Sequence, residues 1–180
     1  MKKAVILSGN LAQDHEFIYP YYRLLEDGFQ LDVCMNEGKK VKGILGTDLP
    51  PNKDQEVKKI EDIKIQDYDL LIIPGGVKAM EKVRQNISMI DFISEFHTQK
   101  KIIGCICSGA QMLISAKIVK GKKISGYYSM KDDIINAGAE YTDLPAVVDS
   151  GIVTTAHYKD LGPWMKAVLD EYYKKNNNAE

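Results

Sequence analysis

The strongest constraint on the fold is a set of apolar segments that do not alternate with polar residues. A strand with one face in water alternates apolar and polar side chains, whereas a strand buried on both faces reads as a continuous apolar run. We therefore expect parallel strands covered by helices on both sides. The clearest of these segments lie at residues 4–7, 29–35, 68–74 and 101–107.

Segments with a helical pattern lie between these strands. Residues 14–27 predict a helix with Asp14 as its N-cap and Gly28 after its end, and Pro20 should kink this helix or mark its first turn. Residues 36–62 are polar and contain several Gly and Pro residues, which predicts a short hairpin and a loop. Further helices are expected at 86–99, 109–118, 130–137 and from Pro163 onward, and a hairpin at 146–149 and 152–156.

This order of elements predicts the α/β class, as a flavodoxin-like three-layer sandwich with a mostly parallel sheet. A chain of 180 residues is long enough for one sizeable core, so we expect a single domain over residues 1–180. The polar residues from about 174 to 180 are expected to form a disordered tail.

Charge and cysteine content exclude several classes of function. The net charge is −1, so no electrostatic argument favours nucleic acid or an anionic membrane as a partner. The apolar run near the N-terminus is too short for a signal peptide or a membrane span. The three cysteines form no disulfide framework, so a cytoplasmic protein with reduced thiols is expected.

Cys107 is the candidate nucleophile. In a parallel α/β sheet the functional crevice lies at the carboxyl ends of the strands, and Cys107 ends one predicted strand just before a predicted helix. Its small neighbours Cys105 and Gly109 suit a sharp turn, and a helix N-terminus should lower the thiol pKa. The alternative is an inert buried thiol, as expected for Cys34; the position of Cys107 favours a nucleophile.

Two further segments should reach the same edge of the sheet. Gly75 and Gly76 follow a predicted strand, and their amides could form an oxyanion hole, although they could equally form a simple turn. Glu16 follows the first strand, and beside a thiolate it should be protonated and donate to sulfur; it could instead be a solvated glutamate in the first helical turn. The sequence contains no G-x-G-x-x-G motif and no set of residues with metal-ligand spacing, so neither a cofactor nor a metal is expected.

Four long segments resemble the ThiJ/PfpI superfamily, and within it the intracellular-protease (PfpI) branch. They cover residues 16–33, 69–76, 105–143 and 147–165, in the same order. The resemblance implies a flavodoxin-like fold, a homodimer or higher oligomer, and a reactive cysteine that corresponds to Cys107. It also implies that Glu16 is the protonated glutamate bonded to the thiol.

The resemblance implies further site residues as well. Gly76 and Ser108 match positions whose backbone amides form the oxyanion pocket. Glu81 resembles an acidic residue that a neighbouring subunit offers in the protease branch, and Tyr127 matches a tyrosine near the pocket.

The sequence departs from the protease branch directly after the nucleophile. That branch has a histidine there, whereas this chain has Ser108, which cannot act as a base near neutral pH. His157 could replace the missing base, although a surface or interface position is favoured for it. His15 could face the rim of the crevice, and His97 is expected to be solvated.

Three functions are therefore open. The first is a small-molecule enzyme of hydratase, glyoxalase or deglycase type, in which Cys107 attacks an electrophilic substrate with help from protonated Glu16. The second is an oxidative-stress sensor or protective protein that uses oxidation of Cys107. The third is a PfpI-type intracellular cysteine protease, which the loss of the histidine disfavours.

Overall fold

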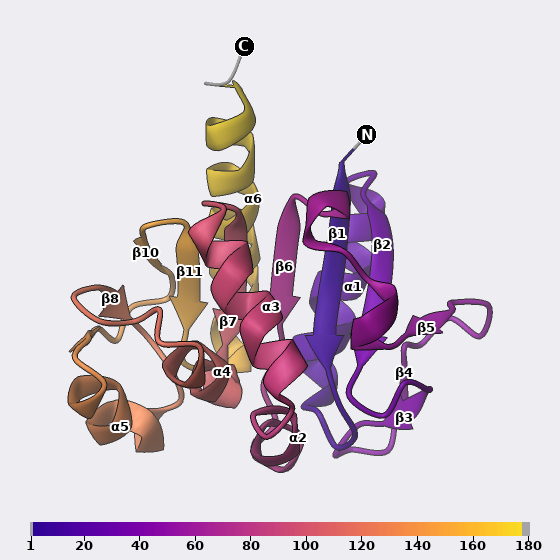
Figure 1. Cartoon of the computed structure of the whole chain (residues 1–180), viewed down its shortest axis with the longest axis horizontal. Helices are drawn as coiled ribbons and strands as arrows, with labels where there is room; N and C mark the ends of the chain where they lie inside the picture. Colours follow the sequence, from indigo (N-terminus) through magenta and orange to yellow (C-terminus); the bar gives the residue numbers. More distant parts are fainter. Residues whose placement is uncertain (1, 178–180) are drawn as a thin grey trace.

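A seven-stranded sheet forms the centre of the computed structural model, which describes residues 2–177 (Figure 1). Neighbouring strands are parallel, except for the antiparallel pair β10–β11 at one edge. In spatial order the strands are β10 (Val147–Asp149), β11 (Ile152–Thr155), β7 (Ile102–Ile106), β6 (Leu70–Ile73), β1 (Lys3–Ser8), β2 (Gln30–Met35) and β5 (Val57–Lys58).

Helices cover both faces of this sheet, which confirms the predicted three-layer α/β fold. One face carries α1 and α6, which pack on β2, β7 and β11, and the other carries α2, α3 and α4 (Figure 1). The helices are α1 (Asp14–Glu26), α2 (Val77–Val83), α3 (Ile87–Thr98), α4 (Ala110–Ser115), α5 (Lys131–Asn136) and α6 (Leu161–Asn177), with short 3₁₀ turns η1 (Ile60–Asp62), η2 (Ile65–Asp67), η3 (Cys107–Gly109), η4 (Tyr128–Met130) and η5 (Tyr158–Asp160).

Close packing of α6 on the strand that leads to Cys107 depends on Gly104. A Cβ atom at Gly104 would lie 2.9 Å from both Ile72 Cδ1 and Val168 Cγ2, so a larger residue would push the helix away from β7. Trp164 of α6 is fully buried beside this glycine, and its indole N–H donates to the carbonyl of Val153 at 3.0 Å. The strand that carries the nucleophile is thereby held in the tightest part of the core.

Two pairs of very short strands lie outside the main sheet. β3 (Val41–Lys42) and β4 (Asp48–Leu49) form the hairpin predicted within residues 36–62, but β5 of the same segment joins the main sheet instead of forming a loop. The parallel pair β8 (Lys123–Ile124) and β9 (Glu140–Tyr141) was not expected. Strands of two residues are too short to show a hydrophobic period, which explains why the sequence pattern missed them.

The ends of two helices differ from the expectation. The N-cap of α1 is Gln13, whose side chain accepts from the amides of His15 and Glu16, and not Asp14. The helix runs through Pro20 without a break. At the other end of the chain, residues 174–177 belong to α6 and are not a disordered tail, while 178–180 lie outside the described residues. Within the described part, no helix is both long and apolar enough to cross a membrane.

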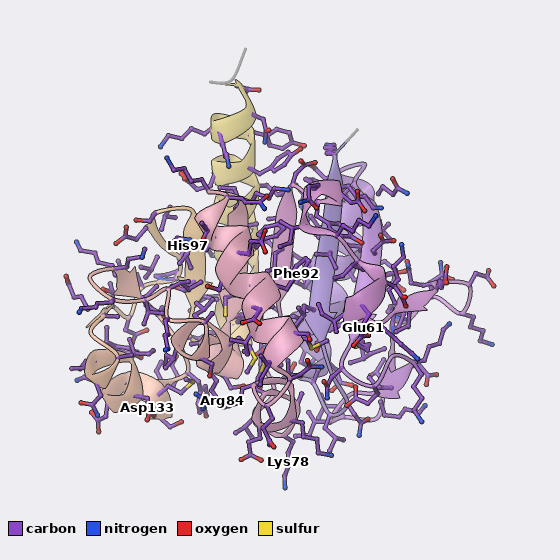
Figure 2. The ribbon with its side chains drawn as sticks, viewed as in Figure 1. Glu61, Lys78, Arg84, Phe92, His97 and Asp133 are labelled. Atoms are coloured by element: carbon purple, nitrogen blue, oxygen red, sulfur yellow. The ribbon has the colours of Figure 1, made fainter. Side chains whose placement is uncertain are left out.

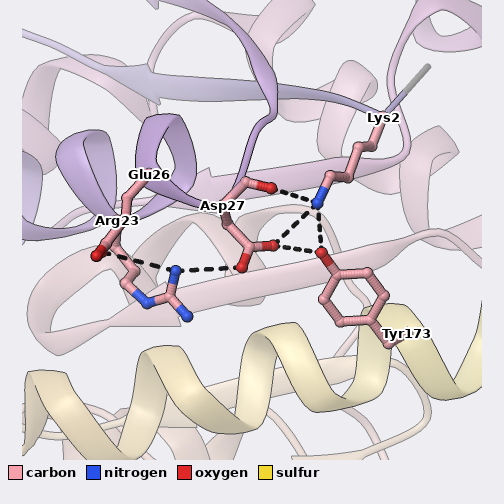
Figure 3. Close-up of polar contacts among 5 residues, drawn as sticks. All are labelled: Lys2, Arg23, Glu26, Asp27 and Tyr173. Atoms are coloured by element: carbon pink, nitrogen blue, oxygen red, sulfur yellow. Dashed lines mark hydrogen bonds and ion pairs between the residues drawn. The ribbon is translucent and has the colours of Figure 1, made fainter.

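A polar cluster connects α1, α6 and the residue before β1 (Figure 3). The carboxylate of Asp27 pairs with Lys2 at 3.2 Å and with Arg23 at 3.3 Å, and it accepts from the hydroxyl of Tyr173. Glu26 lies 3.9 Å from Arg23 at the edge of the cluster. These contacts lie at the amino-terminal edge of the sheet, so they fix the helices without taking part in the crevice at the opposite edge.

Candidate active site

The carboxyl ends of β1, β6 and β7 bring the predicted site residues together. These three strands are neighbours in the sheet, and each is followed by a segment that carries candidate residues. Glu16 lies in the first turn of α1, Gly75 and Gly76 follow β6, and Cys107 follows β7. Segments that are far apart in sequence therefore meet at one edge of the sheet, as the sequence predicted.

Cys107 occupies a strained turn between β7 and α4. Its φ is 60°, in the left-handed region that residues with a side chain rarely adopt. Its carbonyl accepts from the amide of Tyr127 at 3.1 Å, and Gly109 provides the room that the turn needs. A Cβ at Gly109 would lie 2.9 Å from the carbonyl oxygen of Ile73. This strand–nucleophile–helix elbow presents a half-buried sulfur to the crevice.

Glu16 is a completely buried carboxyl group beside the thiol. Its Oε2 accepts from the amide of Gly75 at 2.7 Å, while Oε1 has no hydrogen-bond partner among residues 2–177. Its side chain lies beside Cys107, whose thiol lowers the pKa of the carboxyl group. Burial raises the pKa of Glu16 to about 7, although the bonds from Cys107 and Gly75 lower it in part. The carboxyl group therefore exchanges its proton near neutral pH.

The glycine at position 75 makes this contact between carboxyl and thiol sterically feasible. A Cβ there would lie 2.4 Å from Oε2 of Glu16 and 2.9 Å from Cβ of Cys107. No side chain fits between the two groups. A glycine at this position therefore permits both the turn and the close approach of the carboxyl group to the thiol.

The thiol pKa does not follow the sequence-based expectation. Burial raises the pKa of Cys107, and the charge of an ionised Glu16 raises it further, whereas the amide and hydroxyl of Ser108 lower it. The helix contributes little, because the 3₁₀ turn η3 precedes the short helix α4. Two adjacent negative charges are unfavourable, so Cys107 and Glu16 titrate as a pair that retains one proton above neutral pH.

Ser108 changes the hydrogen bonding expected of the pocket. Its buried Oγ accepts from the amide of Gly76 at 2.8 Å, and the amide of Gly75 already donates to Glu16. Neither glycine amide is therefore free for an oxyanion in this structure. A hydroxyl that accepts from an amide keeps its own proton for another acceptor, and the hydroxyl of Ser108 lowers the pKa of the neighbouring Cys107 thiol.

Aromatic rings form the rim of the crevice next to Tyr127. The ring of His157 lies 4.0 Å from that of Tyr158 and 6.4 Å from that of Tyr127, measured between centroids, and its Nδ1 accepts from the amide of Lys159 at 3.1 Å. Within residues 2–177, His157 has no hydrogen bond to Cys107. The sequence analysis named Tyr127 and His157 as candidates but not Tyr158. Tyr158 belongs to no recognisable motif, so nothing in the sequence distinguished it from other surface tyrosines.

The remaining candidates lie away from the sulfur. Glu81 is exposed on α2 and lines a separate hollow of about 760 Å³, so it does not complete the site of its own chain. His15 is exposed and its ring lies 5.2 Å from that of Tyr158. His97 is half-buried at the end of α3 and not solvated as expected, and burial lowers its pKa. Residues 2–177 contain no group of three or more His, Cys, Asp or Glu side chains that could hold a metal.

Comparison with known proteins shows which family and fold this chain shares. The model of the DJ-1/PfpI family matches residues 2–171. "Deglycase PfpI" of Pyrococcus furiosus is 35% identical over 91% of this chain and 95% of its own. "Putative cysteine protease YraA" of Bacillus subtilis is 35% identical over 94% of this chain and 97% of its own.

A solved structure shares the fold closely. It is a two-domain protein from Anabaena variabilis with DJ-1/ThiJ/PfpI-like and ferritin-like domains, which superposes with a TM-score of 0.86 at 31% identity. It matches 94% of this chain, which spans about half of that longer protein (48%). With the family model matching nearly the whole sequence, the chain belongs to the DJ-1/PfpI family.

Proposed function

We propose that the protein is a cysteine-dependent enzyme of hydratase, glyoxalase or deglycase type that acts on small electrophilic substrates. The observation that carries this proposal is the pair formed by Cys107, at a strained elbow, and the buried Glu16, whose pKa lies at about 7. A nucleophile and a proton carrier in contact are the two groups that addition to a carbonyl carbon requires.

With a 2-oxoaldehyde, the reaction starts when the shared proton lies on Glu16 and the sulfur is a thiolate. Sulfur forms a bond to the aldehyde carbon, the π electrons of the carbonyl move to oxygen, and Glu16 protonates that oxygen. The Glu16 carboxylate then carries the carbon-bound proton to the neighbouring carbon, while the hydroxyl proton passes to the neighbouring oxygen. Water hydrolyses the resulting thioester to a 2-hydroxy acid, so the sum adds one water and needs no oxidant.

Ser108 supports the addition step in this scheme. The developing oxyanion needs hydrogen-bond donors, and both glycine amides are already engaged. The donors beside the Cys107 thiol are the carboxyl of Glu16 and both the amide and the hydroxyl of Ser108. We propose that they replace the amide-only oxyanion pocket implied by the family resemblance.

The names of the two relatives suggest two different activities. The relative named a deglycase supports carbonyl chemistry, and we extend that activity class to this chain as a hypothesis. The relative named a putative cysteine protease raises proteolysis as an alternative. Proteolysis requires a base to activate the nucleophile and protonate the leaving amine, and neither Ser108 nor the aromatic-bound His157 offers one to Cys107.

The test follows consumption of methylglyoxal and formation of lactate by the purified protein, with an isonitrile as a second substrate. We expect turnover that Cys107→Ala abolishes and Glu16→Gln reduces at least tenfold. Cys34→Ala is the matched control, because Cys34 is a fully buried thiol at the end of β2. Turnover that survives in Cys107→Ala, or its absence with both substrates, would contradict the proposal.

Protection or sensing through oxidation is the second candidate function. Two equivalents of peroxide convert a thiolate to a sulfinate and release two water molecules, and the protonated Glu16 could donate to a sulfinate oxygen. The contact between Glu16 and the thiol favours this reading. Mass spectrometry after mild peroxide treatment should then show sulfinate at Cys107 and not at Cys34 or Cys105, which are buried.

Self-association belongs to the same proposal. The family resemblance implies a homodimer or higher oligomer, and Glu81 lies exposed on α2 where a second copy could contact it. Sedimentation velocity should give a species of at least twice the 20.2 kDa chain mass.

A further inference from the structure

A second hollow, of about 640 Å³, lies at the edge of the sheet opposite to Cys107. It is bounded by the end of α3, the second half of α6, the start of β7 and the β10–β11 turn. Figure 2 shows His97 at the end of α3, on this side of the molecule. We call it the basic hollow, and the lining residues that matter here are His97, Lys100, Lys122, Glu171, Lys174 and Lys175.

The charge of the basic hollow is local and does not reflect a basic protein. Its lining has four lysines and a single carboxylate, whereas the whole chain has 24 Lys and Arg against 25 Asp and Glu. The carboxylate, Glu171, lies 3.7 Å from Lys174. Asp149 also lies near Lys122, but it already accepts from the amide of Lys123 at 2.8 Å and from the hydroxyl of Ser150. Lys100, Lys122 and Lys175 make no ion pair within 4.0 Å among the described residues, although the charges of Asp149 and Asp69 act on Lys122 and Lys175 at longer range.

Backbone contacts hold two of these cations in place. The ammonium of Lys122 donates to the carbonyl of Ile118 at 2.8 Å, and that of Lys175 donates to the carbonyl of Lys100. Burial lowers the pKa of Lys175, and the neighbouring Lys101 and Lys100 lower it further. Like charges are thus gathered at some cost, which a bound anion would offset.

His97 adds a polar group that lacks a partner. Its Nδ1 is buried and makes no hydrogen bond to the described residues. Burial and the charge of Lys122 lower the pKa of His97, so the imidazole is neutral near pH 7. Because Nδ1 is buried, His97 lines the hollow through its other atoms.

The hollow also has room for an organic group. Its base includes Ile102 at the start of β7, and the aliphatic stems of the lysines form its walls. A bare inorganic ion would leave most of this space unfilled. The ligand that fits carries at least two negative charges at one end and an apolar body at the other.

We propose that the basic hollow binds a small organic phosphate monoester, with its phosphate between Lys100, Lys122 and Lys175 and its organic part over Ile102. A phosphate monoester is close to a dianion at neutral pH and offers several acceptor oxygens, which suits several ammonium groups better than a monocarboxylate does. The five residues of β7 separate this site from Cys107 by about 15 Å, so the ligand does not contact the nucleophile.

The test measures binding of phenyl phosphate to the full chain by isothermal titration calorimetry at low ionic strength. Inorganic phosphate is expected to bind more weakly because it lacks the apolar body, and benzyl alcohol should not bind. The double variant Lys122→Met and Lys175→Met keeps the aliphatic stems and should raise the dissociation constant at least tenfold. The matched control is Lys131→Met, because Lys131 is exposed at the start of α5, outside the hollow.

Amide chemical shifts locate the ligand independently of affinity. Phenyl phosphate should shift the amide signals of Thr98, Lys100 and Gly151, which line the hollow. Three results would overturn the proposal: an unchanged dissociation constant in the double variant, shifts concentrated at Gly75, Gly76 and Ser108, or small shifts spread over all exposed lysines. The second would place the anion at Cys107, and the third would mean non-specific ion pairing.

Discussion

At the scale of single residues, the site depends on one proton shared between Cys107 and Glu16. Below neutral pH both groups are protonated, and the sulfur cannot attack. Above it the pair has lost one proton, and the remaining one can lie on either group. A low thiol pKa is therefore not required, because the carboxylate can accept the thiol proton during the attack.

The pH dependence of turnover should report this shared proton. We expect kcat/KM to rise about tenfold for each pH unit below 7 and to level off above it, because the pKa of Glu16 is raised to about 7 by burial. Glu16→Gln should remove the plateau above pH 7, because the thiol then titrates alone with the raised pKa that its burial causes. Glu56→Gln is the control at an exposed glutamate and should leave it unchanged. A plateau that persists near pH 7 in Glu16→Gln would assign the titration to another group.

The effect of the Ser108 hydroxyl on Cys107 should be measurable as a change in the reactivity of the thiol. It lowers the pKa of Cys107, so Ser108→Ala should slow alkylation by iodoacetamide at fixed pH. Loss of one hydrogen bond to a charged group, worth about 1.5–3 kcal/mol, corresponds to a decrease of roughly ten- to hundredfold. Ser125→Ala is the control, because Ser125 is also buried but its hydroxyl has no partner among the described residues. An unchanged rate in Ser108→Ala would mean that the hydroxyl points away from sulfur.

Part of this site could be predicted from sequence and part could not. Glu16, Gly75 and Cys107 each follow a strand, and parallel strands end at the same edge of the sheet. The alternation of apolar strands and helices in the sequence predicts parallel strands, so it also predicts that these residues meet. The bond from Gly76 to Ser108 could not be foreseen, because it depends on where one hydroxyl points. The burial that raises both pKa values likewise depends on packing around the pair and not on spacing along the chain.

At the scale of elements, Asp14 connects the start of α1 to the β3–β4 hairpin. Its carboxylate accepts from the amides of Leu45 at 2.8 Å and Thr47 at 3.0 Å. The backbone of Gly43 lies against this carboxylate, because a Cβ at Gly43 would lie 2.2 Å from Oδ1 of Asp14. A residue expected from sequence to cap its own helix instead caps the hairpin, and Gln13 takes the role at the helix.

Asp14→Ala should therefore destabilise the hairpin more than the helix. Two buried hydrogen bonds to a charged acceptor are lost, and we expect a decrease of about 2 kcal/mol in the free energy of unfolding. Denaturant unfolding measures the total, and hydrogen exchange at Leu45 and Thr47 should accelerate. Asp14→Asn keeps one acceptor oxygen and should give an intermediate loss. Faster exchange throughout α1 with a protected hairpin would contradict this assignment.

Element prediction succeeded where segments were long and apolar. The four apolar runs became β2, β6, β7 and β1, all largely buried, because each carries enough residues to show its pattern. The seven-residue helix α2 was not expected after Gly76, since its exposed face is polar and its buried side chains are only three, Ala79, Met80 and Val83. Strands of two residues are defined by tertiary pairing alone.

At the scale of the whole molecule, the two edges of the sheet have different roles. The carboxyl edge carries the strained elbow and the buried pair, and the amino edge carries the Asp27 cluster and the basic hollow. Both edges share β7, whose residues are buried throughout. The nucleophile therefore follows a fully buried strand, while Tyr127 follows the two-residue strand β8.

Native-state hydrogen exchange should separate these parts. Amides of β1, β6 and β7 are flanked by strands on both sides and covered by helices, so they should exchange only through global unfolding. Amides of β8 and β9 belong to a pair of two-residue strands outside the main sheet and should exchange through local opening with a lower free energy. Equal protection of the two groups would contradict the prediction. If the difference is found, the rim around Tyr127 can move to admit a substrate while Cys107 and Glu16 keep their contact, because opening of β8–β9 breaks no bond between the acid and the thiol.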